Sequence, residues 1–119
     1  VLHAAYNDAQ GVTAAFNLNL LQRINRELGG DFDLTQFRHL AFYDPVAGRI
    51  EMHLESLCAQ TVTIAGHEFT FAAGERLHTE NSYKYAIDEF RELARGAGFA
   101  ARQVWCDPRG YFAVHLLTA

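Results

Sequence analysis

The spacing of the apolar residues changes once along this chain, near residue 30, and this change constrains the fold more than any other feature. Before it, apolar residues recur at every fourth position, which is the spacing of an amphipathic α-helix. They are Val12, Phe16, Leu20, Ile24 and Leu28. After it, short runs rich in β-branched and aromatic residues predict strands. One long helix followed by several strands is typical of an α+β fold.

The ends of the helices are marked by capping residues. Asn7 or Asp8 is placed to cap the start of the long helix, and Gly29-Gly30 is placed to end it. A second, short helix is expected after Asp33, because Gln36 follows at the spacing of a capping box.

The middle of the chain predicts antiparallel strands. Residues 37–57 contain two apolar runs around a turn from Asp44 to Gly48. Alternation in the second run places its apolar side chains on one face and its polar ones on the other. The two sets are Ile50, Met52 and Leu54, and Glu51, His53 and Glu55. Residues 61–71 predict a hairpin around Ala65-Gly66, and residues 75–85 continue as extended chain.

The last part of the chain predicts a helix and a hairpin. The segment "AIDEFRELARGAGF" has acidic residues near its start, and Gly96 and Gly98 end it. Two strands, "AARQVWC" and "YFAVHLL", follow around the turn "DPRG". This order of elements resembles the end of the sheet in many Rossmann-like methyltransferase domains, which are α/β folds.

Composition excludes several classes of function. The chain has 119 residues, a net charge of −4 and a single lysine, so it offers no basic stripe for nucleic acid. No apolar run approaches the roughly 20 residues of a membrane span, and the start lacks the features of a signal peptide. The two cysteines, Cys58 and Cys106, are far apart and fit free thiols. We therefore expect a cytoplasmic protein that contacts neither nucleic acid nor membrane.

The stretch "RLHTENSYKY" is dense in polar and aromatic side chains. In an extended chain, His78, Glu80 and Ser82 would share one face, and Thr79, Asn81 and Tyr83 the other. The Glu80 carboxylate and the Ser82 hydroxyl would then lie about 7 Å apart and bind the two nitrogens of a flat heterocycle. A solvated edge strand is the alternative.

Other chemistry has weaker support in the sequence. Glu51 and His53 alternate as metal ligands on a strand do, but no HxH or HExxH motif accompanies them, so we expect no metal site. No GxSxG motif or cysteine with a neighbouring histidine is present, so no catalytic residue is assigned. Asn17 and Asn19 are unfavourable within a helix, and at least one of them should be hydrogen-bonded to another element.

Several strings together resemble a known family. They are "AAYNDAQGVTAAFNLNLLQRINRELGGDFDL", "FYDPVAGRIEMHLES", "HTENSYKY" and "FRELARGAGFAARQVWCDPRGYFAVHLL". In order and over nearly the whole chain, they are similar to the C-terminal half of the histidine-specific, S-adenosylmethionine-dependent methyltransferases. These enzymes trimethylate the α-amino group of histidine in ergothioneine biosynthesis.

The resemblance implies a substrate site for histidine. Glu80 and Ser82 match residues that hold the imidazole of the substrate, and Tyr6 matches the tyrosine that binds its carboxylate. Met52 matches a methionine that lines the imidazole pocket. Thr13 and Phe16 match further pocket positions. The implied cofactor is S-adenosylmethionine, and no general base is assigned.

The resemblance also implies a division of the chain. Residues 1–85 correspond to a substrate-recognition domain, and residues 86–119 to the last helix and hairpin of a Rossmann-like cofactor domain. The family's glycine-rich loop, ribose-binding acidic residue and amine-binding asparagine have no counterpart in this sequence, so the cofactor site lies mostly outside it. This piece alone is expected to be inactive. A non-catalytic amino-acid-binding module and a purely structural remnant are the alternatives.

Overall fold

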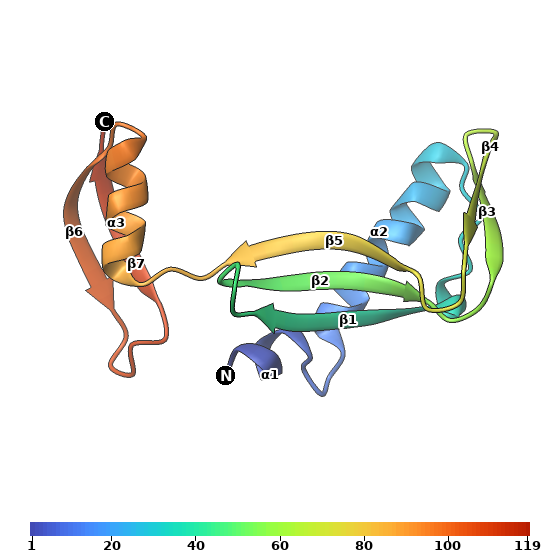
Figure 1. The fold of residues 1–119 in the computed structure, drawn as a ribbon, viewed down its shortest axis with the longest axis horizontal. Coiled ribbons are helices and arrows are strands. Elements are labelled where there is room, and N and C mark those ends of the chain that lie inside the picture. Colours follow the sequence, from blue (N-terminus) through green and yellow to red (C-terminus); the bar gives the residue numbers. More distant parts are fainter. The chain divides into compact units, whose positions relative to one another are not determined.

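The computed structural model describes residues 1–119 as two compact units, Val1–Tyr83 and Lys84–Ala119 (Figure 1). We call them unit 1 and unit 2. The division falls close to the one predicted after residue 85, while the roles assigned to the two parts stay predictions. Both units combine helices with antiparallel strands, so the fold is mixed α and β. No helix in either unit has the length and apolar character that crossing a membrane requires.

Unit 1 is a sheet with helices on one face and a small hairpin beside them. Strands β1, β2 and β5 form an antiparallel sheet in that order, and β3 pairs with β4. The bounds are α1 Leu2–Tyr6, α2 Val12–Leu28, a 3-10 turn Leu34–Gln36, β1 Phe37–Asp44, β2 Arg49–Ser56, β3 Gln60–Ile64, β4 His67–Phe71 and β5 Arg76–Tyr83.

The Asp8 side chain caps the start of the long helix as predicted, although the N-cap position itself is Gly11, with a φ of +72°. The Asp8 carboxylate accepts hydrogen bonds from the backbone N–H of Val12 and of Thr13, at 2.9 and 3.0 Å. These bonds, the one from Thr13 foremost, hold the pKa of Asp8 below its usual value. Gly29 ends the helix with a φ of +63°, a conformation that favours glycine.

After α2, the expected short helix is only a single 3-10 turn. The Asp33 carboxylate accepts a hydrogen bond from the backbone N–H of Thr35 at 3.0 Å, which is the predicted capping role. The chain then passes directly into β1 at Phe37.

The buried face of α2 differs from the apolar repeat that predicted the helix. Leu21 and Asn17 are its buried residues, whereas Phe16 remains 67% exposed. Val12, Leu20 and Leu28 of the repeat are exposed as well. Ile24 of the repeat does pack against the core. The four-residue spacing therefore predicted the helix correctly but only part of the side that packs.

The core of unit 1 lies where α2, the sheet and the β3–β4 hairpin meet. Its buried members are Leu21, Phe32, Phe37, Leu54, Val62 and Phe71. Three phenylalanine rings contact one another there, with Phe37 and Phe71 edge to face at 5.5 Å between centroids. This packing fixes one end of the sheet and leaves the α1 end for a site.

Unit 2 contains α3 (Ile87–Gly96) and a hairpin of β6 (Ala100–Cys106) and β7 (Ala113–Thr118). The predicted turn is present, because Gly110 N–H donates to the Asp107 carbonyl at 3.0 Å. Ala94 is the one buried hydrophobic residue of the unit. Leu93, Trp105, Phe112 and Val114 are each more than half exposed, so the apolar faces of the hairpin are open within this chain.

Candidate functional site

A β-bulge in β5 decides which side chains form the site. His78 pairs with His53, whereas Glu80 pairs with Met52, so Thr79 is an extra residue in the ladder. Residues opposite each other on neighbouring strands share a face of the sheet. The bulge therefore puts His78 on the face of His53 and puts Glu80 on the face of Met52.

This pairing contradicts one prediction about which side chains of β5 share a face and agrees with another. His78, Glu80 and Ser82 do not share a face as expected, because the bulge separates His78 from the other two. Glu80 and Ser82 do lie on the same face, since they pair with Met52 and Ile50, two alternate residues of β2. That face carries α1 and α2.

The helix-covered face of the sheet brings together most of the predicted site residues. The Tyr6 hydroxyl, at the end of α1, donates a hydrogen bond to Ser82 Oγ at 2.9 Å. Met52 is 2% exposed and lies opposite Glu80. A groove between α2 and β5 is lined by Phe16 and Glu80 together with Asn17, Asn19, Leu20, Arg23 and Thr79.

Thr13 lies at the start of α2 and outside this groove, and its predicted pocket role stays a prediction. Its hydroxyl donates to the backbone carbonyl of Ala5 at 3.1 Å, and its backbone N–H bonds to Asp8. The side chain thus ties the start of α2 to α1. It is absent from the residues that line the groove beside Glu80.

A buried amide connects α2 to the bulge. Asn17 is 3% exposed, and its Nδ2 donates to the His53 carbonyl and to His39 Nδ1, both at 3.0 Å. Its Oδ1 accepts a hydrogen bond from the Thr79 hydroxyl at 2.8 Å. The prediction that a helical asparagine is bonded to another element is confirmed at Asn17. The roles of His39 and Thr79 were missed, because no local pattern marks a bulge.

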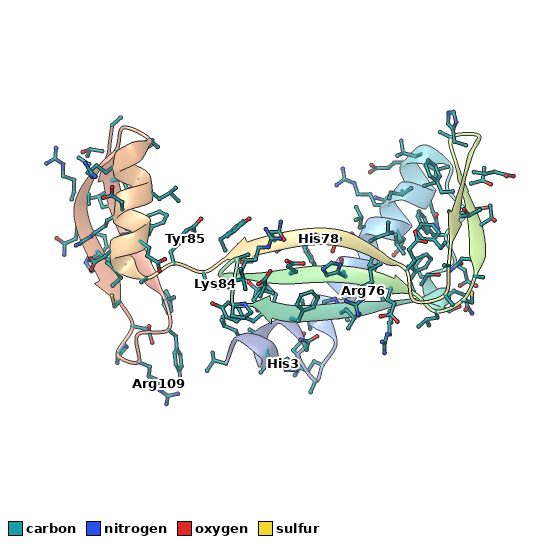
Figure 2. All side chains as sticks on the ribbon, viewed as in Figure 1. His3, Arg76, His78, Lys84, Tyr85 and Arg109 are labelled. Atoms are coloured by element: carbon teal, nitrogen blue, oxygen red, sulfur yellow. The ribbon has the colours of Figure 1, made fainter.

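The opposite face of the sheet carries an ionic network around Glu51. One carboxylate oxygen lies 2.9 Å from His53 Nε2 and 3.7 Å from His78 Nε2, and the other lies 2.9 Å from Arg49. The hydrogen bond from His53, followed by that from Arg49, holds the pKa of Glu51 below its usual value. His78 is labelled on β5 in Figure 2.

The Glu51, His53 and His78 ligand atoms lie within 4.8 Å of one another, which the sequence did not predict for His78. The two imidazole rings are stacked at 4.4 Å with a 20° angle between their planes. Two rings stacked face to face lie in different planes, so their in-plane lone pairs do not converge on one ion in this arrangement. Arg49 also brings a positive charge to the same carboxylate. The geometry is that of stacking and ion pairing.

The helix-covered face thus has the character of a small-molecule site. A carboxylate and two hydroxyls lie beside the apolar side chains of Met52 and Phe16, a mixture that orients a small polar ligand. Comparison of the sequence with known families supports a site for a small molecule. Residues 1–119 match the family described as "Histidine-specific methyltransferase, SAM-dependent". The chain belongs to this family of methyltransferases.

Two similar proteins are named as histidine methyltransferases. The chain is 45% identical over 114 residues to a histidine N-alpha-methyltransferase of Mycolicibacterium smegmatis. It is 42% identical, also over 114 residues, to one of Mycobacterium tuberculosis. These alignments cover 94% of this chain and 36% of each relative, so the chain spans about a third of their length. An uncharacterized protein of Sinorhizobium fredii is 30% identical over 110 residues.

Proposed function

We propose that the protein carrying this chain transfers methyl groups from S-adenosylmethionine to the α-amino group of histidine, as in ergothioneine biosynthesis. The chain would supply much of the substrate site. The family match supports the class of reaction. The observation that carries the proposal for this site is the Tyr6–Ser82 hydrogen bond, which joins residues 76 positions apart on the face that holds Glu80.

Glu80 and Ser82 suit a neutral imidazole. One nitrogen of such a ring is a donor and the other an acceptor. The Glu80 carboxylate accepts from the N–H, and the Ser82 hydroxyl donates to the other nitrogen. Met52 and Phe16 offer apolar contact to the ring. Glu80 is exposed and Ser82 half-buried in this chain. A site built to hydrogen-bond both ring nitrogens rejects amino acids that lack them.

The role proposed for Tyr6 requires a change of partner. A tyrosine hydroxyl has one proton, and here that proton is directed to Ser82. To hold the substrate carboxylate, Tyr6 must turn its O–H toward the ligand. Ser82 then loses this donor while its own proton serves the imidazole. We therefore propose that histidine replaces the Tyr6–Ser82 hydrogen bond with two bonds to itself.

S-adenosylmethionine, when bound, supplies an electrophilic methyl group. No residue of this chain is assigned to it, because Gly96 and Gly98 follow a helix and precede a strand, the reverse of a nucleotide-binding turn. The contribution of unit 1 is to hold histidine in one orientation, so that its unprotonated α-amino group reaches the methyl carbon. We propose that most of the cofactor site lies outside these residues.

We also propose that residues 1–85 form a substrate-recognition domain and residues 86–119 the end of a Rossmann-like sheet. The division into two compact units supports this assignment. The exposed apolar side chains of the β6–β7 hairpin support it as well, because further strands and helices would cover them.

Calorimetric titration of histidine tests the proposal, with and without S-adenosylhomocysteine, in this chain and in a version extended upstream. Histidine and the cofactor product should both bind the extended protein, with phenylalanine as the control that lacks ring nitrogens. Binding of histidine by the short chain alone would favour a preformed amino-acid-binding module. Absence of histidine binding by the extended protein would refute the proposal.

A further inference from the structure

We propose that Asn17 and Thr79 are positioning residues for histidine recognition, because they hold the β-bulge that turns Glu80 toward the helices. This inference rests on the proposed function. Neither residue needs to touch the imidazole for this role. They act through the position of Glu80 on β5.

The two side chains bond the backbone at the point where the register shifts. The pairing of β2 with β5 is interrupted between Met52 and His53. The Thr79 hydroxyl lies 3.0 Å from the Met52 carbonyl oxygen, and Asn17 Nδ2 donates to the carbonyl of His53 at 3.0 Å. A bulge disrupts the ladder locally, and a buried carbonyl without a partner is costly. Asn17 satisfies the His53 carbonyl, and the single proton of the Thr79 hydroxyl is shared between the Met52 carbonyl and Asn17 Oδ1, which lies 2.8 Å away.

The orientation of the Asn17 amide is fixed by these partners. A carbonyl can only accept, so the NH₂ group must face His53 and the Oδ1 must face the Thr79 hydroxyl. The second N–H then points at His39 Nδ1, which must be an acceptor. His39 Nε2 consequently carries the ring proton and donates to the Tyr6 carbonyl at 2.7 Å.

These bonds form a closed path through the site. It runs from Thr79 through Asn17 and His39 to the backbone of Tyr6, and the Tyr6 hydroxyl returns to β5 at Ser82. The bulge and the Tyr6 end of α1 are therefore fixed by one set of side chains. Thr79 itself contacts only the bulge end of this path, next to Glu80 on β5.

The bulge matters because side chains in a strand alternate between faces. In a regular β5, Glu80 would share the face of His78, and the sequence alone predicted this arrangement. The extra residue reverses the alternation after His78, so Glu80 faces α2 while His78 stays beside Glu51. If Thr79 lost its bonds, the carboxylate would no longer be held against the groove.

A double-mutant cycle on the upstream-extended protein tests the inference. Thr79→Val removes the hydroxyl and keeps the shape, and Thr79→Ser restores the hydroxyl. Histidine Kd is measured by calorimetry for each variant, with and without Glu80→Ala. We expect Thr79→Val to raise Kd about tenfold in the parent, and less than about threefold when Glu80 is absent. Thr79→Ser should return Kd to within about twofold of the parent.

The outcomes distinguish a positioning role of Thr79 from a general loosening of the fold. Coupling between Thr79 and Glu80, with rescue by serine, supports the positioning role. An equal loss of affinity in both backgrounds would show general loosening and overturn it, while Glu80→Ala alone would still report on the proposed function. A parent protein that binds no histidine would overturn both. If Thr79→Val does not fold, by circular dichroism, Thr79→Ala replaces it in the cycle, since a smaller side chain introduces no clash.

Discussion

Two asparagines in one helix give a matched pair for measuring the hydrogen-bond network at the bulge. Asn17 and Asn19 both lie within α2, two positions apart, so the same substitution changes helix propensity equally at both. Asn17 is buried with three hydrogen-bond partners, whereas Asn19 is exposed. Comparing alanine at the two positions therefore isolates the contribution of the Asn17 hydrogen bonds to the free energy of unfolding.

The structure sets the expected size of the difference. Asn17→Ala leaves the His53 carbonyl without its amide donor and His39 Nδ1 without the amide that it accepts from. Each such group costs about 1–3 kcal/mol when it is buried and unsatisfied. The better helix propensity of alanine offsets about 0.5 kcal/mol of this loss. We expect Asn17→Ala to lower the free energy of unfolding by about 1.5–5.5 kcal/mol, and Asn19→Ala to raise it by about 0.5 kcal/mol.

Urea denaturation of both variants measures this difference. Far-ultraviolet circular dichroism is the suitable signal, because Trp105, the single tryptophan, lies in unit 2 and would not report on α2. The midpoints are compared at equal denaturant slope, so that a change in midpoint reflects stability. If the free energies of unfolding of the two variants agree within about 0.5 kcal/mol, the Asn17 hydrogen bonds do not stabilise the fold and the reasoning fails.

Three further predictions concern the site and the core. In the upstream-extended protein, Glu80→Ala should cost about 1.5–3 kcal/mol of histidine affinity by calorimetry; an unchanged Kd would remove Glu80 from the site. Leu54→Ala should destabilise unit 1 by about 2–5 kcal/mol in urea, since Leu54 is fully buried in the core; a smaller loss would contradict that packing. The lowered pKa of Glu51 means that its stabilisation is complete above pH 4.5 and is lost as pH falls through the lowered value. In urea denaturation at a series of pH values, Glu51→Gln should therefore weaken the fall in the free energy of unfolding on the acid side. An unaltered pH dependence would show that the ionic network around Glu51 does not contribute to stability.

Local patterns predicted most elements of this fold. The caps of α2, the hairpin around Ala65-Gly66 and the turn at Asp107 all follow from residues within a few positions of each other. Such signals can be recognised in the sequence because each type of turn and each helix end favours particular residues. The buried side of α2 was predicted only at Ile24, since it also depends on a polar residue, Asn17, whose partners are strands far along the chain.

The site shows the same limit. Alternation along β5 correctly grouped Glu80 with Ser82, because no irregularity lies between them. It misplaced His78, because the bulge at Thr79 is held by a side chain 62 positions away in sequence. The pairing of Tyr6 with Ser82 is similarly long-range. The family resemblance named these residues, and only the folded chain gives their contacts.

The connection between the two units has a practical consequence for protein chemistry. The chain has a single lysine, Lys84, and it lies between the end of β5 at Tyr83 and the start of α3 at Ile87 (Figure 2). A lysine-specific endoproteinase therefore has one bond to cut, and that cut separates the two units while every proposed ligand-binding side chain stays in one product. Amine-reactive dyes likewise have one side-chain target in this chain, two residues after Ser82.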